Sequence, residues 1–155
     1  MIQVAVIMGS ASDDEFMTRT CRVLDHFGIS HESTVLSAHR NPDRLDTYIH
    51  EAEQKGVQVF VAAAGMAAHL AGAIASRTRL PVIGVPLPLG DLKGMDALLS
   101  TVQMPSGIPV ATMSIGKAGA ENAAIMAARI LALTDHKLAD KLKDFMKNGS
   151  KITSK

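Results

Sequence analysis

The chain is poor in the residues that define several protein classes. Its 155 residues include one cysteine, one tyrosine and no tryptophan, and aromatic residues make up 3%. The single cysteine, Cys21, excludes a framework of disulfides within the chain. With so few aromatic side chains the core must be aliphatic, and alanine and nine methionines are available for it. We expect Cys21 to be a packing residue on the flank of a helix, not a nucleophile.

An excess of charge of one sign is also missing, as are long hydrophobic runs. The chain has 16 basic and 15 acidic residues, so its net charge of +1 favours neither nucleic acid nor an anionic membrane as a partner. The longest apolar stretch, 57–75, is rich in alanine and glycine and is interrupted by His69, unlike a membrane span. No leader-like pattern opens the chain. We therefore expect a soluble cytoplasmic protein.

Short apolar runs alternate with longer amphipathic segments along the chain. Runs such as 4–8 are continuous, which is typical of strands buried on both faces of a parallel sheet. Strands are expected at residues 4–8, 31–36, 57–63, 81–85 and 109–113. Helices are expected at residues 13–27, 42–55, 68–78, 91–102, 119–133 and 135–148.

This order predicts an α/β fold built on a parallel sheet. Five strands favour a flavodoxin-like three-layer sandwich with sheet order 2-1-3-4-5, helices on both faces and an extra C-terminal helix. No linker or repeat interrupts the pattern. We expect one domain over 1–148, followed by a polar, frayed tail at 149–155.

Local signals predict where individual helices begin and end. Ser12 and Glu15 have the spacing of a capping box for the first helix, and Gly28 is placed to end it. Asn41 and Pro42 suit the N-cap and first position of the second helix.

Polar residues follow each of the first three expected strands. Ligands of open parallel sheets bind beyond the carboxyl ends of the strands, near the switch point of the strand order. The three segments are 9–13, 37–40 and 64–70. Because the order 2-1-3 makes their strands neighbours, we expect the three segments to line one pocket.

The segment 9–13 has features of an anion site. It leads into a helix N-terminus, whose free N–H groups favour phosphate, and Ser10 and Ser12 add hydroxyl donors. Asp13 would repel phosphate, so a ribose hydroxyl is its better partner. The same residues also suit ordinary helix capping, and this segment alone leaves both interpretations open.

The segment 37–40 combines a proton carrier with a fixed cation. His39 can give or take a proton near neutral pH, and the Arg40 guanidinium suits phosphate or carboxylate. An isolated His-Arg pair is more often an exposed loop, but its place at a strand end favours a functional role. His69 is interpreted as a hydrogen-bonded structural residue. The spacing of the six histidines predicts no metal site.

Five segments together resemble one known family. They are Gly9–Asp13, Ser37–Arg40, Ala67–Leu70, Gly84–Pro86 and Gln103–Val110. In this order and spacing they resemble the N5-carboxyaminoimidazole ribonucleotide mutases of de novo purine biosynthesis. The resemblance extends over 4–139, and Ser-Ala-His-Arg with Gln-Met-Pro-x-Gly-x-Pro is its most specific part.

The resemblance implies an isomerase that moves CO2 from the exocyclic nitrogen to carbon 4 of an aminoimidazole ribonucleotide. It implies that His39 is the catalytic acid/base and that Ser10, Asp13 and Arg40 bind the substrate. It also implies a homo-octamer with active sites at subunit contacts and without metal, biotin or ATP. Further residues are expected to line the pocket: Gly9, Ser12, Ser37, Ala38, Gly65, Ala67, His69 and Leu70.

The chain departs from the family pattern at the third loop. Met66 stands where the family often has glycine, and Ala71 where it often has proline. If that position needs a positive φ, Met66 carries a cost. Two alternatives stay open: direct carboxylation of aminoimidazole ribonucleotide by CO2, in a sister class with lysine at the position of Arg40, and a non-enzymatic nucleotide-binding domain of the same fold. The scarcity of aromatics disfavours a flavin carrier.

Overall fold

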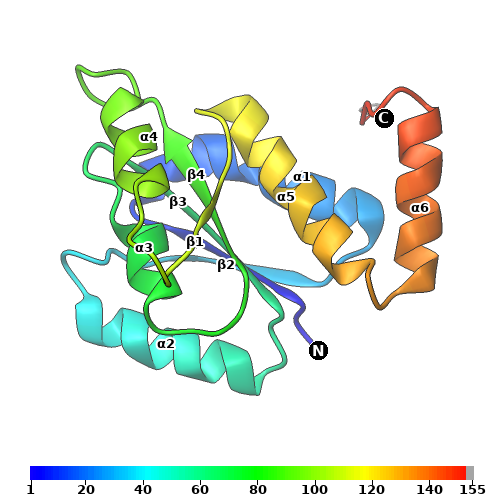
Figure 1. Ribbon diagram of the computed structural model, residues 1–155, viewed down its shortest axis with the longest axis horizontal. Helices are drawn as coiled ribbons and strands as arrows, with labels where there is room; N and C mark the ends of the chain where they lie inside the picture. The colour runs from blue at the N-terminus through cyan, green and yellow to red at the C-terminus, as the bar shows by residue number, and fades with distance from the viewer. Residues whose placement is uncertain (153–155) are drawn as a thin grey trace.

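A five-stranded parallel sheet runs through the middle of the computed structural model, which describes residues 1–152 (Figure 1). Its strands are β1 (Val4–Met8), β2 (His31–Val35), β3 (Val59–Gly65), β4 (Val82–Leu87) and β5 (Ala111–Thr112). The order β2-β1-β3-β4-β5 confirms the predicted flavodoxin-like topology. Of the predicted polar tail, residues 153–155 lie outside the described residues.

Helices cover both faces of the sheet and complete three layers. They are α1 (Asp14–Phe27), preceded by the 3-10 turn η1 (Ala11–Asp13), then α2 (Pro42–Gln54), α3 (Leu70–Ala75), α4 (Met95–Val102), α5 (Lys117–Leu131) and α6 (His136–Lys147). Helices α2, α3 and α4 lie on one face, and α1 and α5 on the other (Figure 1). The predicted extra helix, α6, packs outside α1 and α5. No described helix is long and apolar enough to cross a membrane.

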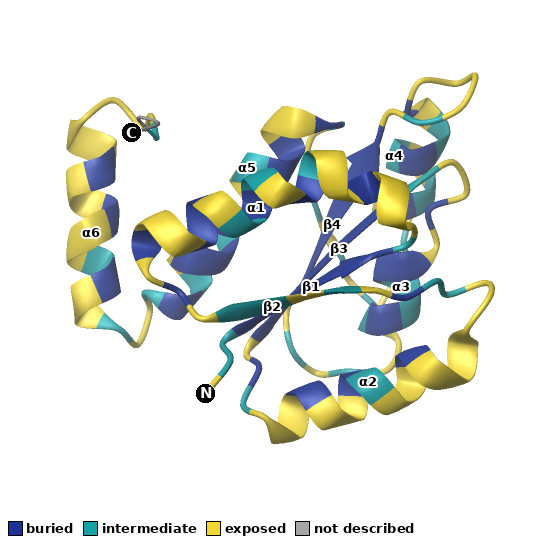
Figure 2. Cartoon of the chain, turned by 180° about the vertical axis from the view of Figure 1, so that it is seen from behind, coloured by how far each residue is buried: buried dark blue, intermediate teal, exposed yellow. Residues whose placement is uncertain are grey.

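The alternation of side chains along the strands divides the core in two. In β1, Val4, Val6 and Met8 face α1 and α5, whereas Ala5 and Ile7 face α2 and α3. All of β1 is buried, as Figure 2 shows in dark blue, because helices cover both sides of this strand. The core is mainly aliphatic, as predicted, although Phe27 and Phe60 are among its largest buried side chains. Cys21 is partly buried against it.

Strand β4 runs further than predicted, and the reason lies in its neighbours. Pro86, which lies beyond the expected strand 81–85, pairs with Ala64 of β3 inside β4. Strand β5 pairs with β4 only as far as Gly84, so the missing N–H of Pro86 breaks no ladder bond on that side. The Pro86 carbonyl instead accepts a hydrogen bond from the backbone N–H of Gly116 at 2.9 Å.

Several helix boundaries also differ from the prediction. The capping box of Ser12 and Glu15 is wrong, because η1 precedes α1 and the Asp13 carboxylate accepts from the Ser10 N–H instead, at 3.0 Å. Helix α4 begins at Met95 because the preceding turn includes the positive φ angles of 52° at Lys93 and 91° at Gly94. Helix α3 is shorter than predicted and has six residues.

Other predicted ends are confirmed. Gly28 ends α1 with a φ of 72°. Asn41 and Pro42 occupy the predicted positions at the start of α2, although the Asn41 side chain makes no capping hydrogen bond. The N-cap of α6 is Asp135, whose side chain accepts from the N–H of Leu138 at 3.1 Å.

The strand register brings three loops to one edge of the sheet. Met8, the last residue of β1, lies opposite Val35 of β2 and Ala63 of β3. The three strands therefore end nearly level. The connections that follow them gather at the left side of the molecule in Figure 1, as the sequence predicts.

Gly119 of α5 lies very close to the backbone of Ser114, which precedes the helix. A substitution at Gly119 therefore tests how tightly the start of α5 is packed. A Cβ at Gly119 would lie 1.7 Å from the Ser114 carbonyl oxygen, so backbone would have to move. We expect Gly119→Ala to lower the free energy of unfolding by about 3 kcal/mol or more, measured by urea denaturation.

The matched control is Gly72→Ala in α3. A Cβ there would meet only the flexible thioether of Met104, whose sulfur is 3.0 Å away. The change in unfolding free energy should stay within about 1 kcal/mol, because alanine is the better helix former. Equal losses in both variants would contradict the packing described for α5.

Candidate active site

The connections after β1, β2 and β3 enclose a cavity of about 270 Å³. All the residues named from the sequence as catalytic, substrate-binding or pocket-lining lie around it: Gly9, Ser10, Ser12, Asp13, Ser37, Ala38, His39, Arg40, Gly65, Ala67, His69 and Leu70. Ala64, Met66 and Leu89 complete the wall. Segments about 60 residues apart in the chain thus meet at one site.

Leu89 is a wall residue that was not named from the sequence. Pro86, the first residue beyond the expected strand 81–85, lies within β4, and Leu89 supplies the contact from the connection that follows. A Cβ at Gly65 would lie 2.7 Å from the Leu89 Cβ, so the approach of the two connections requires glycine at 65. The one available signal was an apolar residue between Pro88 and Gly90 in an otherwise turn-like segment.

Two histidines from different connections meet in this cavity. Nε2 of His39 lies 2.6 Å from Nδ1 of His69, and the rings meet edge to face with an interplanar angle of 84°. One ring nitrogen must donate and the other accept, so the tautomers of the two rings are coupled. The prediction that His69 is hydrogen-bonded is confirmed, and its partner is the proposed acid/base.

The backbone around His39 is held by a tight turn. The Ser37 hydroxyl accepts a hydrogen bond from the Arg40 N–H at 3.2 Å, and the Ser37 carbonyl accepts from the Asn41 N–H at 2.9 Å. His39 and Arg40 remain exposed. Within residues 1–152 the Arg40 guanidinium has no hydrogen bond or ion pair, so its charge is available to an anionic group.

Asp13 is a buried carboxylate with one unused oxygen. The side chain is 1% exposed, and Oδ1 has no hydrogen-bond partner among the described residues. Burial raises the pKa of Asp13, although hydrogen bonds from the backbone of Ser10 and Gly9 act in the opposite direction. A buried acceptor on the wall of a cavity fits a hydroxyl donor from a ligand.

The serines beside Asp13 are placed differently. The Ser12 hydroxyl donates to the Ser10 hydroxyl at 3.1 Å, and both side chains are exposed at the cavity. They lie on the η1 turn that leads into α1. The two hydroxyl groups therefore lie at the cavity on the same side as Asp13.

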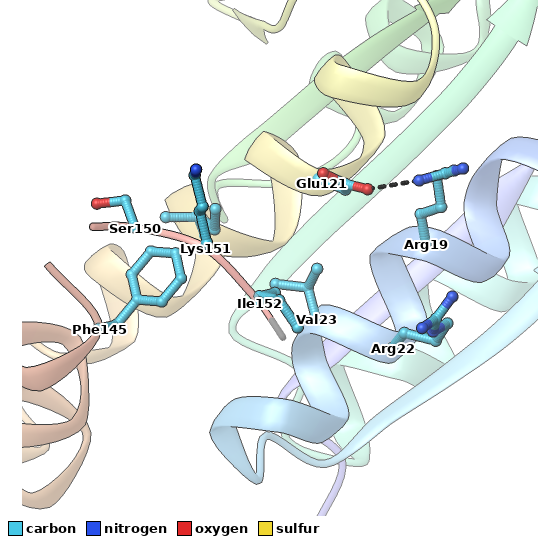
Figure 3. Close-up of a pocket in the computed structure, with 9 residues that line it drawn as sticks. Arg19, Arg22, Val23, Glu121, Phe145, Ser150, Lys151 and Ile152 are labelled. Atoms are coloured by element: carbon cyan, nitrogen blue, oxygen red, sulfur yellow. Dashed lines mark hydrogen bonds and ion pairs between the residues drawn. The ribbon is translucent and has the colours of Figure 1, made fainter. Parts of the chain in front are cut away.

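A larger cavity of about 430 Å³ lies between α1, α5, α6 and residues 150–152 (Figure 3). Its Arg19 is already paired with Glu121 at 2.7 Å, and its wall combines charged and apolar side chains. It has no histidine and does not include the connections at the strand ends, so we place the chemistry in the smaller cavity. Among residues 1–152, no group of three or more His, Cys, Asp or Glu residues could hold a metal ion.

A model of the family described as AIR carboxylase matches residues 3–151. The chain belongs to the AIR carboxylase family. The N5-carboxyaminoimidazole ribonucleotide mutase of Saccharolobus solfataricus is 54% identical over 145 residues, which are 94% of this chain and 90% of that protein. The mutase of Bacillus subtilis is 52% identical with the same shares covered, and that of Escherichia coli K12 is 49% identical over 94% and 86%.

A solved structure agrees with this assignment. The crystal structure of Treponema denticola PurE matches with a TM-score of 0.88 and 29% identity, and the match covers 97% of this chain and 92% of that one. The resemblance identified from the five sequence segments is therefore confirmed at the level of the AIR carboxylase family.

The pKa of Asp13 leads to a prediction about stability and pH in this family member. Because the folded-state pKa lies above the ordinary 3.8, the fold is favoured by protonated Asp13, and this contribution is lost as pH rises through the folded-state pKa. Asp13→Asn should therefore be more stable than the wild type at neutral pH, by about 1 kcal/mol, because no buried charge is left unpaired. At a pH below the ordinary pKa of 3.8, the difference in stability between Asp13→Asn and the wild type should vanish.

Calorimetry across the acid to neutral range measures this difference as a shift in Tm. Asp14→Asn serves as the control, because Asp14 is exposed and its replacement leaves the buried Asp13 carboxylate in place. A lower Tm for Asp13→Asn than for the wild type at neutral pH would show that the carboxylate stabilises the fold.

Proposed function

We propose that this protein converts N5-carboxyaminoimidazole ribonucleotide to 4-carboxyaminoimidazole ribonucleotide, an isomerisation of de novo purine biosynthesis. The observation that carries the proposal is the contact of His39 with His69 at 2.6 Å, in a cavity that also includes Asp13 and Arg40. Relatives about half identical over 94% of the chain bear the name of this activity.

Different polar residues of the cavity bind different parts of the substrate. Arg40 and the hydroxyls of Ser10 and Ser12 bind the phosphate, because they supply charge and hydrogen-bond donors. Asp13 accepts a hydrogen bond from a ribose hydroxyl through Oδ1, which has no partner within residues 1–152. The aminoimidazole ring then lies toward His39.

His39 acts as both acid and base in this proposal. It donates a proton to the carbamate nitrogen, the bond from that nitrogen to the carboxyl carbon breaks, and CO2 is released with its electron pair left on nitrogen. Carbon 4 of the electron-rich ring attacks CO2 and forms the new carbon–carbon bond. His39 then removes the proton from carbon 4, which restores aromaticity and its own protonated state.

His69 is a positioning residue for His39. Its Nδ1 shares a hydrogen bond with the Nε2 of His39, so the protonated form of His39 can donate to neutral His69. This contact holds the imidazole in one orientation between the two proton transfers. Because the proton given in the first step returns in the last, these steps need no metal, biotin or ATP.

A two-substrate assay tests the proposed function. The purified protein should form 4-carboxyaminoimidazole ribonucleotide from N5-carboxyaminoimidazole ribonucleotide faster than from aminoimidazole ribonucleotide with CO2. His39→Asn should keep the fold and lose activity by on the order of a hundredfold or more, since general acid–base catalysis contributes about that much. Turnover of only the uncarboxylated ribonucleotide with CO2 would favour direct carboxylation instead.

The proposal includes a homo-octamer with active sites at subunit contacts. Supporting it is an exposed apolar face on and before α4, formed by Leu92, Met95, Leu99 and Val102, with exposed fractions of 46–63%. These residues recur at helical spacing, and Ala97 on the opposite side of α4 is buried. An apolar face of this kind marks a contact surface.

Light scattering coupled to size exclusion tests the assembly. Replacing Met95 and Leu99 together by aspartate should break the octamer into smaller species, because charges would be desolvated at the contact. Leu133→Asp changes an exposed leucine between α5 and α6 and should leave the octamer intact. If the octamer survives the α4 replacements, the subunit contact does not lie on this face of α4.

We further infer that residues 1–148 act as one domain and that the protein works in the cytoplasm. Supporting the first inference are the single sheet formed by all five described strands and a family match over residues 3–151. Supporting the second is the proposed substrate, a phosphorylated biosynthetic intermediate.

A further inference from the structure

The cavity between α1, α5, α6 and residues 150–152 has no role in the proposed reaction. It measures about 430 Å³, against about 270 Å³ for the cavity that contains His39, and no residue lines both. A cavity of this size is in the usual range for a site that takes a small organic molecule. Its lining therefore shows what kind of molecule it could hold.

Basic side chains outnumber acidic ones on its wall. Arg19, Arg22 and Lys151 are basic, and Glu121 is the one acidic residue among the described lining residues. The Glu121 carboxylate already accepts a hydrogen bond from Arg19 at 2.7 Å. Within residues 1–152, the side chains of Arg22 and Lys151 have no hydrogen bond and no ion pair. The wall thus has positive charge that the protein itself does not offset.

The two arginines lie at the same end of the cavity. Both belong to α1, three residues apart, and Figure 3 shows their side chains on the side opposite Lys151. Residues three apart on a helix are neighbours, so two like charges there repel each other. Only Glu121 faces the pair, and a second anion would offset the repulsion. A guanidinium group suits the oxygen atoms of a phosphate.

Apolar side chains line the cavity between the arginines and Lys151. Figure 3 shows Val23 of α1 and Ile152 of the segment after α6 in this position. Val23 is buried, and Ile152 is partly buried and packs against the core, so the end of the described chain forms a wall of the cavity. This surface can exclude water from the hydrocarbon part of a ligand.

We propose that this cavity binds a small organic phosphate ester. Its phosphate contacts Arg22 and Arg19, and its apolar group lies on Val23 and Ile152. Three basic residues and one acidic residue leave an excess of two positive charges, and a phosphate monoester carries about two negative charges near neutral pH. Inorganic phosphate lacks the apolar group, so it should bind more weakly than the ester.

Fluorescence anisotropy of naphthyl phosphate, titrated with the full-length assembled protein, tests the site. The probe is fluorescent, and the chain has no tryptophan to interfere. Arg22→Gln should weaken binding on the order of tenfold, because one charge-assisted hydrogen bond is lost. Arg22 is exposed, so the Tm should not change. Ile152→Ala should weaken binding of naphthyl phosphate but not of inorganic phosphate, measured by calorimetry.

Two other arginines provide matched controls that each remove one positive charge. Arg129→Gln changes an exposed arginine of α5 outside this cavity, and Arg40→Gln changes the cavity that contains His39. Both variants should keep a site with the affinity of the wild type. In the Arg40→Gln background, the further change Arg22→Gln should remove most of the remaining binding.

The other outcomes overturn the proposal. Wild type that does not bind the probe has no such site. Equal weakening by Arg129→Gln and Arg22→Gln would show general attraction to a basic surface. Weakening by Arg40→Gln alone would place the probe in the cavity that contains His39. Mutase turnover is measured separately and should be unchanged in Arg22→Gln, so failure of the proposed function and failure of this site appear in different assays.

Discussion

Parallel pairing of β1 with both β2 and β3 is the constraint on which the site depends. Met8 lies opposite Val35 on one side and Ala63 on the other, so three strands stop near one line. Side chains alternate along a strand. Shifting β1 by one residue against its neighbours would therefore turn the side chains that face α1 and α5 toward α2 and α3, and the reverse. Burial on both faces of β1 therefore maintains the register that brings the three connections together.

The cavity includes groups that a purely structural region would avoid. Asp13 is buried with an unused oxygen, and Met66 adopts an unfavourable φ. Each is held by backbone that is itself well packed: Asp13 by the N–H of Ser10, and Met66 by its contact along Gly90. Such features concentrate at functional sites, where the surrounding fold offsets their cost.

Much of this arrangement was predictable because the local signals agree with one another. Continuous apolar runs identified β1, β3 and β4, and polar segments at the strand ends identified the loops. Predictions were wrong where a neighbouring element decides a boundary. Pro86 remains in β4 because β5 is short, and the Ser12–Glu15 capping box is replaced by a bond between Ser10 and Asp13 because η1 precedes α1.

The sequence by itself determined the class of fold, the order of the elements and the kinds of side chain at the strand ends, since these follow from periodicity and local chemistry. Only the tertiary structure decided that His69 contacts His39, that one oxygen of Asp13 is buried without a partner, and that Leu89 and Met66 pack on glycines of facing connections. These contacts join segments far apart in the chain. They depend on strand register and on the close approach of backbones, which no local pattern of residues specifies.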